Sequence, residues 1–378
     1  MYYAKDIVDE LNQSGQIAIF GAGIMALDVA GCLLEKPYRF PIECCLVSDL
    51  RCNPSEVLGI PVINFSMAAQ RLHKDAVILV AAADGKNLDS MRKTLRQHGY
   101  THLISVHYES DLWCLLRGNS YREACLRQNK PYLALEEELE KTEAYAEEGE
   151  NSIRVYTAKC HVDRPVQEDL SRYSWETPIQ VGAALTEKRI CEICDNTGDH
   201  ISDKNSQYCE VTALYWIWKN DCSDYVGLGH YRRHFELTEE QVKKLAASDI
   251  DVVLTIPIFD FPDVETVYRR DHVGSDWDVM LEAIRILAPD YRETAQILGG
   301  ECFYYGYNMF IMRREIFEEY CRWLFPILFY CEEHCGKKKD AYQNRYIGFL
   351  AEHLMAIYFR RQECRYKIVH ARKHFVEG

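Results

Sequence analysis

Four polar residues follow an apolar run at one point in the sequence, and their side chains suit the binding of phosphate. The run YVGLG reads as a buried strand, and it is followed by His230, Tyr231, Arg232 and Arg233. In parallel α/β sheets, ligands bind at the carboxyl ends of the strands. Guanidinium groups hold phosphates through charge-assisted hydrogen bonds. We therefore predict that these four residues bind phosphates; surface arginines beside a satisfied histidine are the alternative.

A second polar cluster lies on a loop just before a predicted helix near residues 209–219. Side chains there could contact a ribose, a base or a diphosphate at the amino end of the helix. The residues predicted to bind a ligand in this segment, together with one residue after an earlier strand, are Asp195, Asn196, Lys204, Asn205, Tyr208 and His161. Helix capping is the alternative, with Asp203 or Asn205 as the N-cap and Glu210 in the early helix.

Three carboxylates are candidates for proton transfer, because a general base must take a proton from the attacking hydroxyl group in many transfer reactions. Glu352 lies in FLAEHL, on a predicted helix, and is the first choice. Asp276 and Asp278, near His272, are the second choice. A polar residue on a helix surface is the alternative for Glu352, and capping or a solvated turn is the alternative for the two aspartates.

Two histidines near the C-terminus, His370 and His374 in YKIVHARKHF, are candidate metal ligands. Neutral imidazole suits Mn²⁺, whereas Mg²⁺ prefers oxygen ligands, so either divalent metal stays open and solvated histidines are the alternative. The sequence contains 16 cysteines, and one CxxC is formed by Cys191 and Cys194. Structural zinc normally needs four ligands, so we expect mostly buried thiols instead.

The elements that must position these residues alternate between strands and helices, which predicts α/β domains with parallel sheets. From residue 16, the sequence IAIFGAGIMA gives a strand, a glycine turn and a helix. We expect Gly21 and Gly23 to let a nucleotide phosphate approach that helix, and Asp49, after the second strand, to accept a ribose hydroxyl. A tight turn in a domain that binds nothing is the alternative.

An acidic run, LEEELEKTEAYAEEGE, separates two such regions. We predict a Rossmann-like domain of the nucleotide-binding type at residues 1–133, an acidic linker at 134–151 and a second α/β domain at 152–378. The net charge of −14 argues against nucleic acid as a partner. A signal peptide and a membrane-spanning run are not expected from the sequence, which favours a cytoplasmic protein.

From Ile153 to about Phe359, the chain resembles a bacterial capsular and exopolysaccharide glycosyltransferase family that was long catalogued as a domain of unknown function. The matching segments are IRVYTAKCHVD, IQVGAAL, DNTGDHISDKNSQYCEVTALYWIWKN, DYVGLGHYRRHF, YNMFIMRREIFEEYCRWLFPIL and IGFLAEHL. The resemblance implies a GT-A-like fold and a UDP-sugar donor, including galactofuranose donors. It also implies that the clusters at 195–208 and 230–233 contact this donor.

Such enzymes commonly carry a DxD motif for a divalent metal and the donor diphosphate. Here the corresponding strand ends in GHYRR, and literal matches occur only at Asp249/Asp251 and Asp276/Asp278. This departure puts the metal in doubt, since Arg232 and Arg233 could neutralise the diphosphate alone. In related transferases an acidic helix residue similar in position to Glu352 acts as the base, and some take a metal ligand from a C-terminal histidine.

The resemblance therefore implies transfer of a hexosyl group, for example galactosyl or galactofuranosyl, to a saccharide acceptor in capsule, exopolysaccharide or O-antigen synthesis. A lipid-linked acceptor would bring peripheral contact with the inner face of the membrane. Residues 17–106 resemble the N-terminal domain of sugar acyltransferases, which favours a sugar-nucleotide or regulatory ligand. The alternatives are an NAD-dependent enzyme that modifies nucleotide sugars and a non-catalytic subunit that binds them; the missing YxxxK weakens the former.

Overall fold

The computed structural model describes residues 2–142 and 152–376. The chain forms two compact units. The first comprises Met1–Pro131 together with Phe259–Pro262, and the second comprises Tyr132–Ile258 and Asp263–Gly378.

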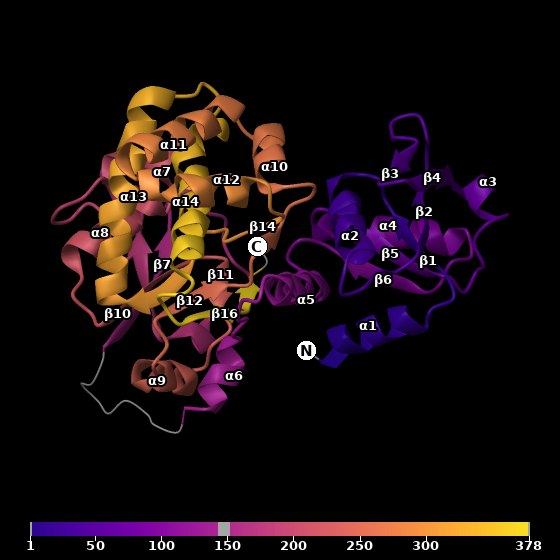
Figure 1. Ribbon diagram of the computed structural model, residues 1–378, viewed down its shortest axis with the longest axis horizontal. Helices are drawn as coiled ribbons and strands as arrows, with labels where there is room; N and C mark the ends of the chain where they lie inside the picture. Colours follow the sequence, from indigo (N-terminus) through magenta and orange to yellow (C-terminus); the bar gives the residue numbers. More distant parts are fainter. Residues whose placement is uncertain (1, 143–151, 377–378) are drawn as a thin grey trace. The chain divides into compact units, whose positions relative to one another are not determined.

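The first unit is built on one mostly parallel sheet with the strand order β3-β4-β2-β1-β5-β6, in which only β3 runs antiparallel to its neighbour (Figure 1). Its strands are β1 (Ile17–Phe20), β2 (Ile42–Val47), β3 (Glu56–Val57), β4 (Ile60–Asn64), β5 (Val77–Ala81) and β6 (Leu103–Val106). Its helices are α1 (Tyr2–Gln13), α2 (Ile24–Leu34), α3 (Phe65–Ala68), α4 (Leu88–Gln97) and α5 (Asp111–Arg127). The predicted α/β architecture with a parallel sheet is confirmed.

The second unit contains a larger sheet with the order β16-β12-β15-β10-β7-β8-β9, and β11 extends it by pairing with β10 and β17. Its strands are β7 (Ile153–Lys159), β8 (Glu176–Gln180), β9 (Ile193–Cys194), β10 (Tyr225–His230), β11 (Arg233–Phe235), β12 (Val252–Thr255), β15 (Phe310–Arg313), β16 (Ile368–Ala371) and β17 (Lys373–Phe375), with the short β13 (Ile258–Phe259) and β14 (Phe303–Tyr304). On the main path, β15 runs antiparallel to its neighbours and the other strands are parallel to one another. This mixed sheet agrees with the expected GT-A-like fold.

Helices cover both faces of this sheet (Figure 1). They are α6 (Leu135–Glu140), α7 (Asn205–Tyr208), α8 (Val211–Asn220), α9 (Glu239–Ala247), α10 (Val264–Asp271), α11 (Gly274–Leu287), α12 (Arg292–Gly299), α13 (Arg314–Cys335) and α14 (Tyr346–Gln362). Successive strand residues alternate between the two faces. Tyr156 and Phe310 therefore join the core under α8, α11, α13 and α14, whereas Val155 and Ile311 join the core with α6 and α9.

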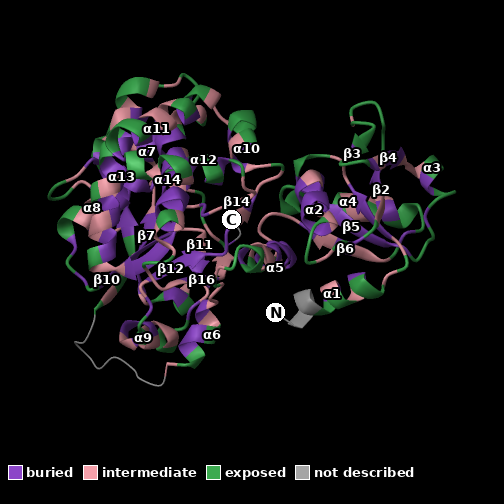
Figure 2. Ribbon diagram, viewed as in Figure 1, coloured by how far each residue is buried: buried purple, intermediate pink, exposed green. Residues whose placement is uncertain are grey.

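The strands and the inward faces of α13 and α14 form the buried interior of this unit (Figure 2). α13 carries its buried residues at helical spacing and packs one side against the core. α14 is buried on nearly all sides from Tyr346 to Phe359, so it is an internal helix of the unit. No helix in the described ranges 2–142 and 152–376 is long and apolar enough to cross a bilayer.

The start of the predicted acidic linker is a folded part of the second unit. Leu135 and Leu139 are spaced four residues apart on α6 and are both buried, while Glu138 forms an ion pair with Lys367 at 2.8 Å. The apolar stripe of α6 is difficult to recognise in a sequence rich in glutamate, because only Leu135 and Leu139 need to face the core. The rest of the predicted linker, residues 143–151, lies outside the described residues.

Candidate active site at the carboxyl edge of the second sheet

The four residues predicted to bind phosphates lie on a tight hairpin at the carboxyl end of β10. His230 ends β10 and pairs in antiparallel register with Arg233, the first residue of β11, so Tyr231 and Arg232 form the turn. The polar run after YVGLG therefore forms the end of one strand, a turn and the start of a second short strand. The hairpin nevertheless keeps all four side chains at the edge of the sheet where the parallel strands end.

Both arginines of the hairpin are held by neighbouring groups. Arg232 donates from Nε to the carbonyl oxygen of Val376 at 2.9 Å, and its guanidinium lies 4.5 Å from the centre of the Phe375 ring. The Arg233 guanidinium lies 4.4 Å from the Tyr307 ring centre and 5.2 Å from that of Phe375. Tyr231 is half-buried, and its backbone N–H donates to the carbonyl of Ala158. Stacking on aromatic rings therefore fixes the orientation of these guanidinium groups.

The loop before β15 joins His230 to Glu352. His230 donates from Nε2 to the carbonyl oxygen of Tyr307, and the Tyr307 backbone also hydrogen-bonds Glu352. Tyr307 and Asn308 have φ values of 71° and 49°, in the left-handed region that residues with a Cβ seldom occupy. Such backbone strain costs roughly 1–3 kcal/mol per residue and is common where a site must hold a fixed geometry.

A second carboxyl group, Glu210, approaches the same histidine. Glu210 Oε1 lies 4.0 Å from His230 Nε2 and accepts a hydrogen bond of 2.7 Å from Asn308 Nδ2. Asn308 is fully buried, also donates to the carbonyl of Gly348, and its Oδ1 has no hydrogen-bond partner among the described residues. Asn308 thus ties the strained loop to α14 and to Glu210.

The Glu352 carboxyl has the most clearly shifted pKa of this group of residues. Burial raises its pKa to about 8, and the nearby Glu210 carboxylate acts in the same direction. The hydrogen bond from the Tyr307 backbone and the charges of Arg233 and Arg345 oppose this rise. A Cβ at position 306 would clash with Ile258 Cδ1 and lie 3.2 Å from Glu352 Oε2, so glycine lets the loop pass this close without displacing either side chain. A carboxyl group with this pKa exchanges its proton near neutral pH.

Burial and the charge of Arg233 lower the pKa of His230, whereas Glu210 raises it, and the net direction is down. His230 is therefore held mainly as neutral imidazole, with its Nε2 proton fixed by the Tyr307 carbonyl. It can hold Tyr307 in place without adding positive charge to the cluster.

Three residues of the cluster were not predicted as ligand-binding or catalytic: Glu210, Asn308 and Arg345. Arg345 directly precedes α14 and donates from Nε to Cys209 Sγ at 3.1 Å. Cys209 is itself at a positive φ of 51° and directly precedes Glu210. Glu210 was interpreted as part of the start of a helix, Asn308 lies just before the apolar strand β15, and Arg345 directly precedes α14. Only the fold brings them together.

The predicted donor contact Asp195 is instead the centre of a buried hydrogen-bond network. Its carboxylate accepts from the backbone N–H groups of Gly182 and Ala183 at 2.9 and 3.0 Å, and from the hydroxyls of Ser202 and Thr212 at 2.5 and 2.6 Å. Four bonds fill the lone pairs of a carboxylate. Asp195 is fully buried. It therefore holds the loop after β8 against α8 and has no oxygen left for a ligand in this arrangement.

The neighbouring predicted residues are also engaged within the unit. Lys204 Nζ and the Tyr208 hydroxyl both contact Glu332 Oε2, at 2.6 and 2.9 Å. Asn205 donates from Nδ2 to the carbonyl of Cys209 and to Thr212. Neither Asp203 nor Asn205 caps a helix through its side chain, since the N-cap of α7 is Lys204 and that of α8 is Glu210. The capping interpretation was wrong, and the polar residues mainly brace the loop.

His161 and Asn196 follow β7 and β9 and are half-buried near the same edge of the sheet. His161 Nδ1 lies 3.7 Å from Cys160 Sγ. Their predicted contact with a donor stays a prediction.

The second-choice carboxylates are paired elsewhere in the unit. Asp276 is buried on α11 and forms an ion pair of 2.7 Å with Lys338. Asp278 is exposed and contacts Arg269 at 2.5 Å. No hydrogen bond or ion pair within residues 152–376 joins either aspartate to His230, Glu210 or Glu352. This geometry favours Glu352 over both as the base.

The two candidate metal ligands do not form a metal site. His370 is buried in the core, with Nε2 3.0 Å from the Tyr305 hydroxyl and Nδ1 3.2 Å from the Leu133 carbonyl, and burial lowers its pKa to about 4. His374 lies on β17 with Nε2 2.8 Å from Glu168. Among the described residues, no three or more His, Cys, Asp or Glu side chains come together as metal ligands would. These histidines therefore do not fit the predicted divalent metal.

In the first unit, the glycine turn after β1 has the predicted form. Gly21 adopts a φ of 130°, and a Cβ there would lie 3.0 Å from the carbonyl oxygen of Ala81. Its N–H donates to the carbonyl of Leu46, while Gly23 is the N-cap of α2. Asp49 is exposed and ion-paired with Arg51, which lowers the pKa of the carboxyl. Nucleotide binding at this turn stays a prediction.

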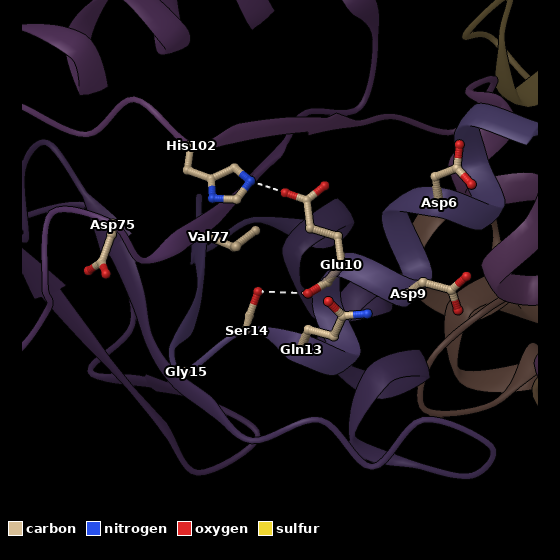
Figure 3. Close-up of a pocket in the computed structure, with 9 residues that line it drawn as sticks. All are labelled: Asp6, Asp9, Glu10, Gln13, Ser14, Gly15, Asp75, Val77 and His102. Atoms are coloured by element: carbon tan, nitrogen blue, oxygen red, sulfur yellow. Dashed lines mark hydrogen bonds and ion pairs between the residues drawn. The ribbon is translucent and has the colours of Figure 1, made fainter.

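A cavity of about 440 Å³ lies at the opposite end of that sheet (Figure 3). It is lined by Asp6, Asp9, Glu10, Gln13, Ser14, Gly15, Asp75, Val77 and His102. These residues come from α1 and from the amino ends of β1, β5 and β6, and His102 contacts Glu10. Ligands of parallel sheets bind at the carboxyl ends, so this acidic cavity is not the predicted nucleotide site.

All sixteen cysteines are free thiols, and only Cys52, Cys222 and Cys364 are exposed. Seven of the sixteen are buried and six are partly buried, so the predicted burial holds for fewer than half of them. Within the described residues, Cys191 and Cys194 of the CxxC belong to no group of three or more possible metal ligands.

One solved structure resembles much of this chain: the apo structure of WbbM, a bifunctional glycosyltransferase. The two are 28% identical, with a TM-score of 0.54 over 60% of this chain. The similar region covers 46% of WbbM, so the chain matches less than half of that protein. No curated protein sequence matches significantly.

A family model matches residues 155–363, which is more than half of the 378 residues and includes β10, α14 and the whole Glu352 cluster. The family is described as a domain of unknown function, DUF4422. The chain belongs to the DUF4422 family.

Proposed function

We propose that this protein is a glycosyltransferase that moves a hexosyl group, such as galactosyl or galactofuranosyl, from a UDP-sugar to a saccharide hydroxyl. The observation that carries the proposal is Glu352, a carboxyl group with a pKa of about 8 beside Glu210 and His230, at the carboxyl edge of a GT-A-like sheet. The similarity to a bifunctional glycosyltransferase supports the same reaction class.

In the proposed reaction, the bond between the sugar C1 and the UDP oxygen breaks, and a bond from C1 to the acceptor oxygen forms. Glu352 takes the proton of the acceptor hydroxyl, and UDP leaves with the bonding electron pair. Because the pKa of the Glu352 carboxyl lies close to neutral pH, this group can accept the proton during the reaction and release it between turnovers. Cationic side chains at the same edge of the sheet would stabilise the charge on UDP.

The acceptor we propose is a growing, lipid-linked saccharide of a capsule, exopolysaccharide or O-antigen. This acceptor would bring the protein into peripheral contact with the cytoplasmic face of the inner membrane. No step of this proposal uses a metal, because His370 and His374 are occupied by other contacts.

The test is a panel of UDP, UDP-galactose, UDP-galactofuranose, UDP-glucose and NAD, measured by thermal shift and by release of UDP with and without saccharide acceptors. We expect stabilisation by UDP and its sugars and acceptor-dependent release of UDP. Stabilisation by NAD but not by UDP would instead support the NAD-dependent alternative. Binding of UDP-sugars without any release would support the non-catalytic alternative.

A further inference from the structure

Arg345 is an exposed guanidinium at the edge of the Glu352 cluster. Its Nε donates to the Cys209 thiol, which is a weak hydrogen-bond acceptor, and its guanidinium lies 5.6 Å from the centre of the Phe349 ring. Neither contact neutralises its charge. In the described part of the chain, no carboxylate forms an ion pair with Arg345 and its two terminal nitrogens have no hydrogen-bond partner.

Acidic groups are nevertheless near: burial raises the pKa of Glu352 and of Asp163, and the charge of Arg345 opposes both rises. Arginines elsewhere on this unit, such as Arg269 and Arg314, close ion pairs with carboxylates at 2.7 and 3.0 Å. Arg345 instead contacts the Cys209 thiol and the Phe349 ring. These contacts orient the side chain and leave the two terminal nitrogens of the guanidinium available for a ligand. Two parallel N–H groups in that form match the oxygens of a phosphate.

The arginines of the hairpin are less available for this role. Arg232 already donates to a backbone carbonyl, and Arg233 is stacked against Tyr307. The hairpin arginines therefore serve better to shape the site than to grip a ligand.

The position of Arg345 relative to Glu352 also fits a reaction between them. The two residues are seven apart along a helical segment, which places them on one face about 10 Å apart along the axis. A base and a group that binds the leaving diphosphate would then lie on the same side of this segment.

We propose that Arg345 binds the diphosphate of the donor and stabilises it as it leaves, an inference that rests on the proposed function. The bond that breaks is the one between the sugar C1 and the diphosphate oxygen, and the guanidinium meets the negative charge that this oxygen gains.

The test measures binding of UDP, uridine and inorganic pyrophosphate to the full chain and to Arg345→Ala. We expect UDP affinity to fall about 10- to 100-fold while uridine affinity stays within twofold, because only the charged hydrogen bonds to phosphate are lost. Competition by pyrophosphate should disappear as well. Arg345→Lys should recover part of the UDP affinity, since it keeps the charge but loses the fork.

Arg285→Ala is the matched control, because this exposed arginine on α11 pairs with Glu282 and should leave all three affinities unchanged. Melting temperatures of the variants establish that they are folded, and Arg345→Lys serves as the test if the alanine variant is not. Unchanged UDP affinity in a folded Arg345→Ala would overturn this inference alone, as would a loss of UDP affinity confined to Arg232→Ala and Arg233→Ala. A wild-type protein that binds neither UDP nor uridine would overturn the proposed function together with it.

Discussion

At the scale of single residues, Glu352 couples the proposed reaction to pH. A base must be deprotonated to act, and a pKa of about 8 leaves this carboxyl mostly protonated at pH 7. We therefore expect kcat/KM to rise with pH and to level off above about 8, because kcat/KM reports the ionisation of the free enzyme. Glu352→Gln should lower kcat by roughly 100-fold or more while changing donor affinity little. Initial rates between pH 6 and 9 test both statements.

Glu210→Gln is the control for the cause of this pKa. Removing the Glu210 charge removes one of the two influences that raise the pKa of Glu352, so the midpoint of the pH profile should move to lower pH. The variant keeps a side chain that can still contact Asn308. A profile whose midpoint stays at the wild-type value in Glu210→Gln, or normal turnover in Glu352→Gln, would remove Glu352 from the role of base.

The residues of this site could be predicted only in part. Glu352 and His230 could be identified as candidates because each is a polar residue within or directly after an apolar element. Polar side chains at such positions are often functional. Arg345 follows a polar stretch and Asn308 lies just before an apolar strand, and neither position was identified as part of a site. Asn308 gains its role from a left-handed backbone and from a partner 98 residues away in the sequence, Glu210. Neither feature can be read from composition or spacing.

At the scale of the elements, Asp195 illustrates how a polar cluster in the sequence can serve the fold. It joins the loop after β8 to α8 through four hydrogen bonds, and each bond to a charged group contributes about 1.5–3 kcal/mol. We expect Asp195→Ala to lower the free energy of unfolding by at least about 3 kcal/mol, because four buried donors lose their acceptor. Urea unfolding followed by circular dichroism measures this change.

Asp199→Ala in the same loop is the control for that variant. Asp199 is exposed and accepts from the Tyr215 hydroxyl at 3.2 Å, so its loss should change stability by less than about 0.5 kcal/mol. If Asp195→Ala and Asp199→Ala changed the free energy of unfolding equally, the stability of the protein would not depend on the hydrogen bonds of Asp195.

β16 and β17 carry the two histidines once expected to bind a metal, and their surroundings predict different consequences. His370→Ala should destabilise the protein by about 2 kcal/mol or more, since it removes a buried ring with two hydrogen-bonded nitrogens. His374→Ala should cost less, about 1 kcal/mol, because it removes a partly exposed pair with Glu168 and a distant stacking contact with Tyr173. Neither should change the response of activity to EDTA or Mn²⁺. Loss of Mn²⁺ activation in a stable His370→Ala variant would restore the metal prediction.

At the scale of the whole molecule, the alternation of strands and helices was enough to predict two α/β units, since hydrophobic periodicity marks both types of element. The boundary between the units was placed too late, because six residues with four glutamates read as solvated. Two leucines one helical turn apart were the only signal of α6, and so short a stripe is easily overlooked. The hairpin after β10 could not be predicted either, because its turn consists of polar residues that continue directly from the strand without a glycine or proline.

Two shortened chains, one beginning at Tyr132 and one at Asn151, differ in whether they contain α6. The first keeps α6, and it also keeps Tyr132, whose ring stacks on His370 at 4.9 Å between centroids. The second exposes the pockets of Leu135 and Leu139, each of which contributes about 1.5–3 kcal/mol when buried. We expect the chain from Asn151 to be less stable by roughly 3–6 kcal/mol, and Leu135→Ala in the full chain to reproduce part of that loss. Denaturant unfolding of both chains and of the Leu135 variant provides the comparison. Equal stability of the two shortened chains would mean that α6 is dispensable and that the second unit begins at β7.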